Sequence, residues 1–600
     1  MLRKLFKFHG GVKPQTNKAQ STTAPIAPVP LPDRLVIPLH QAVGGHPRPL
    51  VHPGDRVLKG QRIGGADGSL SSAVHASTSG IVRDVAPALM PHTSGLSTLS
   101  VIIEPDGEDR WGELDRVNYR STPPDELRDF LRDAGVVGLG GAVFPSYAKL
   151  KPGKEGQLKT LVINGAECEP FITCDDLLMR ERAADMLKGI VAMRHMLHAE
   201  EVLIGIEDNK PEAIAAVKAA IAASGETGIE AVAIPTRYPA GGAKQLIRVL
   251  TGIEVPHGRR STDFGVQCFN VGTAYSIFEA LELGRPLVSR IVTVAGNVAQ
   301  PRNYEVLIGT PMDHLVRLAG PRADTDRYIM GGPMMGVRMP AFDVPVVKAT
   351  NCILVGSPAL FPPPPPEMPC IRCGECAKAC PADLAPFEMY WHSRSKNFGK
   401  AQEYHIFDCI ECGCCSFVCP SHIPLVDYFR FSKSEIWARE RDKDAADTAR
   451  DRFEFKNFRQ EREKQEKAEK LAAKAAATRE KVAGDAAPAA TGAAAAPAKP
   501  GGDDAKRALI EAAMEKARQQ KAQAAPRNTE VAAPELQAEI AAIDARRESA
   551  AKAIAPAPAT EATPPPPPGR PPAPPPPPPV PNTPGPPSPP RPHPAEPPGG

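Results

Sequence analysis

The chain has 600 residues, enough for three or four domains of ordinary size, and a formal net charge of only +3. This near-neutral charge does not favour nucleic acid as a partner of the whole chain. No apolar run reaches the roughly 18–20 residues that span a bilayer, so we expect membrane contact to be indirect, through partner subunits.

After an N-terminal segment of residues 1–29, the first domain, residues 30–120, is predicted to consist of β-strands. Apolar and polar residues alternate between Gly and Pro turns, for example over 51–57 and 74–82. The pattern resembles the barrel-sandwich fold of lipoyl and biotinyl domains. No lysine lies between Gly64 and Val74, where those carriers hold their modified lysine. We therefore expect a structural domain.

Residues 121–285 are predicted to form an α/β domain. Strands at 160–163 and 202–206 alternate with helical periodicity at 176–198 and an Ala-rich helix at 211–223. Residues 286–345 return to β-like alternation around a helix at 312–319. That segment resembles a soluble ligand-binding β-grasp (SLBB-like) module. The overall fold class is therefore multidomain α+β.

A glycine-rich loop in the α/β domain is a candidate cofactor site. Gly138, Gly140 and Gly141 let the backbone approach a ligand closely and present N–H groups to a phosphate, and Lys149 adds a positive charge. The spacing fits neither the Rossmann fingerprint nor the P-loop. A purely structural loop remains the alternative at this point.

A second candidate segment, residues 164–170, follows the strand at 160–163. Ligand-binding groups gather at the carboxyl ends of strands in open α/β sheets, which makes Asn164 a candidate. Glu167 and Glu169 are expected to alternate across the backbone, so that one faces the site and the other supports it. A polar surface loop is the alternative.

Two copies of one cysteine spacing, 39 positions apart, are the most specific pattern in the chain. Each copy is C-x-x-C-x-x-C-x-x-x-C-P, the run that holds [4Fe–4S] clusters in bacterial-type ferredoxins. The copies lie in a predicted ferredoxin domain, residues 362–430, which begins with a polyproline spacer. The cysteines are Cys370, Cys373, Cys376 and Cys380 in the first copy, and Cys409, Cys412, Cys415 and Cys419 in the second.

The fourth cysteine of each run is expected to bind the cluster of the other run. This assignment gives one set of Cys370, Cys373, Cys376 and Cys419, and another of Cys409, Cys412, Cys415 and Cys380. Structural zinc prefers paired C-x₂₋₄-C halves, and disulfide frameworks belong to small secreted domains, so both are disfavoured. Cys414 is an extra thiol whose spacing makes it a bystander beside Cys415.

The C-terminal part is predicted to lack a core of its own. Residues 431–484 are highly charged and helical, which indicates a solvated helix or docking arm. Residues 485–600 are rich in Ala and Pro and are expected to be disordered, because they bury too little apolar surface. Their polyproline runs are alternatively ligands for a partner.

These features together resemble a known family. The loop with Phe144, Pro145 and Lys149 is similar to the FMN/NADH loop of the flavoprotein subunit of respiratory complex I. The resemblance is closer to the C subunit of the Rnf (Rsx) ion-translocating electron-transport complex, and it covers about residues 5 to 480. It rests on segments 8–14, 165–170, 241–246 and 331–336 together with the paired cysteine runs.

The resemblance implies FMN, NAD(H) and two [4Fe–4S] clusters as the redox groups. In that family pattern Gly138, Gly140, Gly141, Lys149 and Asn270 would hold FMN, and Phe144, Glu167 and Glu169 would border the nucleotide. NADH would pass hydride to FMN, which would release single electrons to the clusters. The family also implies a peripheral subunit on the cytoplasmic side of the inner membrane, docked on membrane partners that move Na⁺ or H⁺.

The sequence departs from the complex I pattern near the nucleotide. Leu139 stands in place of Arg, Val143 in place of Gly, Ala166 in place of Asp, and Ala243 in place of an acidic residue. Two other functions therefore stay open: an electron-relay and docking subunit that does not itself oxidise NADH, and a cobalamin reductase with a similar sequence pattern.

Overall fold

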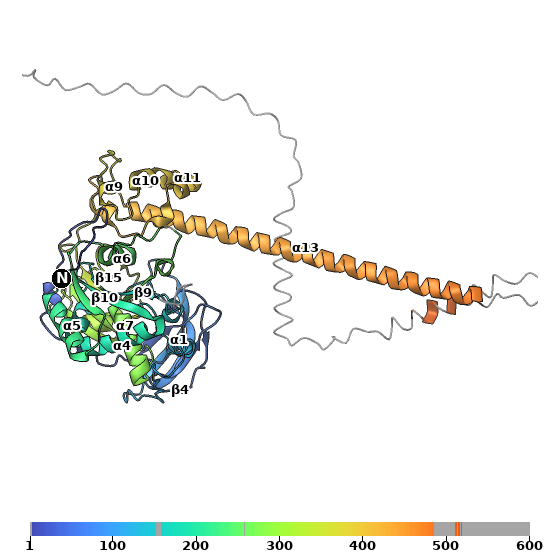
Figure 1. Cartoon of the computed structure of the whole chain (residues 1–600), viewed down its shortest axis with the longest axis horizontal. Coiled ribbons are helices and arrows are strands. Elements are labelled where there is room, and N and C mark those ends of the chain that lie inside the picture. Colours follow the sequence, from blue (N-terminus) through green and yellow to red (C-terminus); the bar gives the residue numbers. More distant parts are fainter. Residues whose placement is uncertain are drawn as a thin grey trace, which may run out of the picture. The chain divides into compact units, whose positions relative to one another are not determined.

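The computed structural model describes residues 3–151, 158–256 and 258–484, together with 511–512, 514–516 and 518. The chain divides into two units, Met1–Glu469 and Lys470–Gly600, and each is described by itself. The first unit contains every described strand and most of the helices (Figure 1). In the second unit the description covers the end of the last long helix and a few helical residues between 511 and 518. The rest of the predicted tail, residues 485–600, lies outside the described residues.

The first domain consists of two small antiparallel sheets around one core. The sheet orders are β2-β8-β7-β4 and β3-β5-β6. Alternate residues such as Leu35, Ile37 and Ile63 point into the shared core, as the sequence pattern predicts. The strands are β2 (Leu35–Pro38), β3 (Arg48–Pro49), β4 (Arg56–Val57), β5 (Arg62–Gly65), β6 (Val74–His75), β7 (Gly80–Leu89) and β8 (Ser97–Pro105).

The α/β domain is built on a parallel sheet with the order β11-β10-β9-β12. Its strands are β9 (Leu158–Gly165), β10 (Ala199–Glu207), β11 (Ile229–Ile234) and β12 (Val266–Asn270). Both faces are buried: Ile163 packs in one hydrophobic cluster and its neighbour Val162 in another. The helices are α1 (Pro124–Asp133), α2 (Ser146–Lys149), α3 (Cys174–Glu181), α4 (Ala183–Leu197), α5 (Pro211–Ser224), α6 (Ala243–Thr251) and α7 (Val271–Leu283), with short 3₁₀ turns at Ala19–Ser21 and Ser261–Phe264.

The helical periodicity at 176–198 corresponds to two separate helices, α3 and α4. Arg182 leaves the helical conformation between them, with φ −129° and ψ 28°. Its guanidinium donates to the Tyr275 hydroxyl at 2.9 Å and to Glu305 at 2.6 Å. Glu305 lies on a strand of the next sheet, so the break lets Arg182 join the two domains.

A mixed six-stranded sheet has the order β1-β14-β13-β17-β15-β16. It includes strands from the segment 286–345, where β-like alternation is predicted, and packs against α8, which spans the predicted residues 312–319. Two strands come from outside 286–345: β1 of the N-terminal segment pairs with β14, and β17 pairs with β13. The elements are β1 (Ala27–Pro28), β13 (Ser289–Gly296), β14 (Arg302–Leu307), α8 (Met312–Ala319), β15 (Arg327–Met330), β16 (Val337–Arg338) and β17 (Cys352–Gly356).

The cysteine runs fold into a module with internal repetition. Its helices are α9 (Glu375–Ala379), α10 (Pro386–Arg394), α11 (Phe398–Glu403), α12 (Cys414–Phe417) and the start of α13 (Leu425–Gly484), with a 3₁₀ turn at Ile406–Asp408. Residues 39 apart share positive φ angles: Arg372 and Glu411 (both 56°), Gly374 and Gly413 (78° and 79°), and Asp383 and His422 (53° and 52°). Helices α10 and α13 also begin 39 residues apart. The sequence repeat is therefore a repeat of backbone conformation.

Helix α13 is long but strongly charged. Among the helices that the structure describes, none is both long enough and apolar enough to cross a membrane.

Candidate cluster and cofactor sites

The first cysteine site is a cavity lined by four thiols. Cys370, Cys373 and Cys376 reach it from the loop before α9 and from α9 itself, and Cys419 reaches it from the end of the second run. Apolar side chains such as Phe387, Ile423 and Leu425 complete the wall. Cys373 is exposed, and the neighbouring Ile371 keeps 68% of its surface accessible. This site, called the first site below, opens toward solvent.

The second cysteine site is lined by five thiols. Cys409, Cys412 and Cys415 come from the second run and Cys380 from the end of the first, and they are joined by Cys414. The structure thus brings together the two sets of four that the sequence predicts, each with one member from the other run. Met389 and Phe429 form part of the apolar wall. This site is called the second site below.

The donor sets fit iron–sulfur clusters. Thiolates are soft ligands that suit iron–sulfur groups, and each cavity gathers at least four of them in apolar surroundings. Burial raises the pKa of Cys376 and of Cys409 to about 11, so both thiols hold their protons at neutral pH when no metal is bound. A metal would displace these protons, because coordinated thiols are deprotonated.

The second site packs against the α/β domain. The Tyr238 hydroxyl donates to the carbonyl oxygen of Cys412 at 2.7 Å. From the N-terminal segment, the Gly11 N–H donates to the Ala379 carbonyl at 2.9 Å, and His9 Nδ1 lies 2.8 Å from the Cys380 carbonyl. Gly10 has φ +61°, and a Cβ there would lie 2.5 Å from the Cys380 carbonyl oxygen, so only glycine allows this approach.

The predicted cofactor segments meet at the carboxyl edge of the parallel sheet. Asn164 and Asn270 are register partners at the ends of β9 and β12. The side-chain amide of Asn164 donates to the Gly241 carbonyl at 2.8 Å, and a Cβ on Gly140 would lie 3.4 Å from Asn270. Gly141 is exposed and has φ +104°. These contacts place the glycine loop beside segments 164–170 and 241–246.

The exposed glycines fit a ligand that lies against the backbone. A Cβ on Gly141 would meet nothing within 4 Å, and the Gly138 N–H is bonded to the Phe144 carbonyl at 2.8 Å, which closes the loop. Asn270 caps α7 by accepting the Gly272 N–H at 2.8 Å. The helix N-terminus beside the loop favours an anionic group such as phosphate.

Lys149 is buried against β12. Its Nζ donates to the Cys268 carbonyl at 2.5 Å and lies 4.5 Å from the centre of the Phe269 ring. Burial lowers the pKa of Lys149. The amino group of this partly buried side chain therefore lies beside the strand residues that directly precede Asn270.

The two glutamates contact different segments, and Glu167 lies at a turn of the chain with φ +47°. Its carboxylate accepts the N–H groups of Asp175 and Asp176 at 2.7 and 3.3 Å, at the start of α3. Burial raises the pKa of Glu167 to about 8. Glu169 accepts the N–H groups of Met334 and Met335 at 2.7 and 3.0 Å. Both carboxylates thus support neighbouring segments, and the expectation that one of them faces the ligand stays a prediction.

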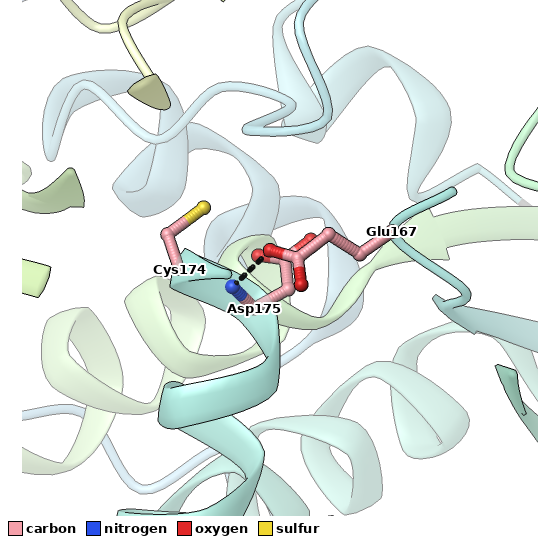
Figure 2. A group of neighbouring side chains, drawn as sticks. All are labelled: Glu167, Cys174 and Asp175. Atoms are coloured by element: carbon pink, nitrogen blue, oxygen red, sulfur yellow. Dashed lines mark hydrogen bonds between the residues drawn. The ribbon is translucent and has the colours of Figure 1, made fainter. Parts of the chain in front are cut away.

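Glu167, Cys174 and Asp175 place their potential ligand atoms within 4.8 Å of one another (Figure 2). The dashed line in Figure 2 is the bond from the Asp175 N–H to Glu167. Asp175 Oδ2 in turn accepts from the Asn270 amide at 2.6 Å, and the charge of Arg290 acts on the same carboxylate. We interpret the trio as the support that orients Asn270.

Four family models match the chain. They are the RnfC barrel sandwich hybrid domain at residues 6–108, the Nuo51 FMN-binding domain at 131–279, the SLBB domain at 291–338 and the 4Fe-4S dicluster domain at 369–423. The chain therefore carries an FMN-binding domain and a dicluster domain, in agreement with the predicted redox groups.

Curated relatives match about three quarters of the chain. The C subunit of the ion-translocating oxidoreductase complex of Yersinia pestis bv. Antiqua is 47% identical over 76% of this chain and 73% of its own length. This chain belongs to the family of these C subunits. Those of Erwinia tasmaniensis and Pseudomonas aeruginosa are 48% and 47% identical over 76% of this chain, which spans only 57% and 59% of their lengths. A solved NAD⁺-reducing [NiFe]-hydrogenase aligns with 51% of this chain and 66% of its own, at 19% identity and a TM-score of 0.38.

Some residues that hold these sites together carried no chemical signal in the sequence. Segment 8–14 was recognised only as a family motif, yet it contacts the first cysteine run directly through His9, Gly10 and Gly11. Lys18 is buried and donates to the Glu169 carbonyl at 2.9 Å. The paired glycines near the N-terminus were the one available hint, because they permit close backbone approach.

Proposed function

We propose that this chain is a peripheral electron-transfer subunit of a membrane-bound, ion-translocating oxidoreductase complex, and that it passes electrons between NAD(H), FMN and two [4Fe–4S] clusters. The observation that carries the proposal is the arrangement of the eight predicted cysteines. They line two separate cavities, and one cavity packs against the domain of the FMN-binding family.

We propose a separate role for the cysteines and for the residues of the glycine-rich loop. Cys370, Cys373, Cys376 and Cys419 would hold one cluster, and Cys409, Cys412, Cys415 and Cys380 the other. The backbone of Gly138, Gly140 and Gly141, with Lys149, Asn164 and Asn270, would hold FMN, and Phe144 would border the nucleotide. When bound, the flavin supplies the exchange between two-electron and one-electron chemistry, and the clusters carry single electrons.

Glu167 and Glu169 have supporting roles in this proposal. Glu167 fixes the start of α3, where Asp175 orients Asn270. Glu169 holds the backbone of Met334 and Met335, and a Cβ on Gly413 would lie only 2.7 Å from the Met334 carbonyl oxygen. The glutamates thereby connect the flavin segment to the loop of the second site.

The two cysteine sites suit different positions in the path. Hydrogen bonds from Tyr238 and Gly11 connect the second site to the rest of the unit. We therefore propose that the second site is the one next to the flavin. The first site has an exposed thiol, Cys373, beside exposed Ile371 and Met368. We assign it to exchange with partner subunits on the cytoplasmic side of the inner membrane, since the relatives are named as subunits of a complex.

Anaerobic purification followed by measurement of iron, acid-labile sulfide and flavin tests the proposal. We expect about eight irons per chain, with a similar amount of sulfide, and one flavin. NADH should then bleach the flavin absorbance. A protein that holds zinc or lacks labile sulfide would contradict the redox function. Full clusters with a flavin spectrum that NADH leaves unchanged would instead identify a relay subunit.

A further inference from the structure

The second site contains one thiol more than a cluster needs. Cys414 lines the same cavity as Cys380, Cys409, Cys412 and Cys415, and it is fully buried. Among the described residues, only four thiols line the first site. At the position 39 residues before Cys414 stands Glu375, whose side chain is half exposed and pairs with Lys378. The two copies of the repeat therefore share their backbone conformation, but the second copy contains one cysteine more than the first.

The backbone brings Cys414 next to one particular ligand position. Gly413, with φ +79°, separates Cys412 from Cys414 and turns the chain into α12. Cys412 and Cys414 belong to the same buried cluster, and both line the cavity of the second site. An exchange of one sulfur for the other at the same metal position therefore needs only a small movement of side chains.

A buried cysteine often acts only as a small apolar residue, and part of the surroundings of Cys414 fits that role. It packs with Val12, Tyr238 and Ala379. Packing alone, however, does not require a fifth sulfur at the wall of a cavity that four other thiols line. The chemistry of that cavity is ligation of soft metals.

We propose that Cys414 is a reserve ligand of the second site, able to take the metal position of Cys412. The inference rests on the proposed binding of a cluster there. The exchange is a ligand substitution without electron transfer. The Cys412 sulfur leaves the iron and takes up a proton, and the Cys414 thiol loses a proton as its sulfur binds the same iron. The number of thiolate ligands and the total charge therefore stay the same; in Cys412→Ala the proton of Cys414 goes to solvent. The first site has no such reserve, because Glu375 occupies the equivalent position.

The test compares equivalent substitutions in the full-length chain, reconstituted anaerobically with iron and sulfide. Cys412→Ala should retain about eight irons per chain, whereas Cys373→Ala, its counterpart in the first site, should fall to about half. The double variant Cys412→Ala/Cys414→Ala should also fall to half, and Cys414→Ala alone should keep the full content.

A spectroscopic readout accompanies the iron measurement. The EPR spectrum of reduced Cys412→Ala should keep two interacting clusters with altered g values for one of them, and the double variant should lose that signal. Cys409→Ala removes another ligand of the same cavity. It serves as a control for position, because Cys414 is proposed to replace only Cys412, and it should lose half the iron.

Loss of half the iron in Cys412→Ala, equal to the loss in Cys373→Ala, would overturn the reserve role. That result leaves the proposed function intact, because the wild-type chain would still hold both clusters. Absence of iron and sulfide from the wild-type chain would contradict the proposed function itself.

Discussion

Burial of Lys348 makes the stability of the first unit depend on pH. Its side chain is 1% exposed, and Nζ donates to the carbonyls of Ala73 and Gly135 at 3.0 and 2.7 Å. These carbonyls belong to the barrel-sandwich and α/β domains, so the lysine joins both to the six-stranded sheet. Burial lowers the pKa of Lys348 to about 7, and burial also lowers the pKa of nearby His75 to about 3.

The direction of the effect follows from proton binding in the two states. An unfolded lysine has a pKa of about 10.4, so above pH 7 the unfolded chain keeps a proton that the folded chain loses. The free energy of unfolding therefore rises with pH between about 7 and 10. The contribution is about 2 kcal/mol from pH 7 to 9, and about 3.5 kcal/mol from pH 7 to 10. His75 stays neutral throughout and adds nothing to this slope.

Pulse proteolysis in urea at pH 7 and pH 9 measures the difference. We expect the wild-type chain to gain about 2 kcal/mol relative to Lys348→Met, which has no titrating group at this position. Lys218→Met, a change at an exposed position of α5, serves as the matched control and should keep the wild-type pH dependence. Equal slopes for the wild-type chain and Lys348→Met would refute the reasoning.

Three further predictions concern the sites. Cys419→Ala should remove the cluster signal of the first site, and EPR that instead shows loss of the second-site signal would contradict the exchange of ligands between the runs. Tyr238→Phe leaves the Cys412 carbonyl without its hydroxyl donor, at a cost of about 1–3 kcal/mol, and hydrogen exchange around the second site should rise while the first site is unchanged. Lys149→Met should lower the flavin content several-fold without changing the iron content, and unchanged flavin would remove Lys149 from the phosphate site.

The sequence predicted the elements that depend on local periodicity. The helix at 312–319 and the strands at 160–163 and 202–206 all appear, because continuous burial or regular amphipathic spacing is visible in single segments. The cysteine spacing likewise predicted which four cysteines would lie together in each cavity, since the geometry of the loop around a cluster determines that spacing. The sequence pattern was therefore sufficient for features that residues close together in the chain determine.

Features that depend on tertiary contacts were missed. The break at Arg182 arises from partners in α7 and β14, and no signal near residue 182 indicates it. The contact of Glu167 with the start of α3 accompanies a positive φ at Glu167, which the sequence pattern does not indicate. The spacing of the two acidic residues in the sequence does not reveal that one of them binds the N–H groups at the start of the following helix.

The two cysteine sites are alike in sequence but differ in how the fold constrains them. Three distant segments hold the second site through Gly10, Tyr238 and Met334, and glycines at positions 10 and 413 allow the closest approaches. The first site lacks comparable cover at Cys373, which is exposed. In the proposed function, the acceptor of electrons from the flavin needs a fixed position, and the acceptor that serves partner subunits needs to be accessible. The second and first sites, respectively, would meet these two requirements.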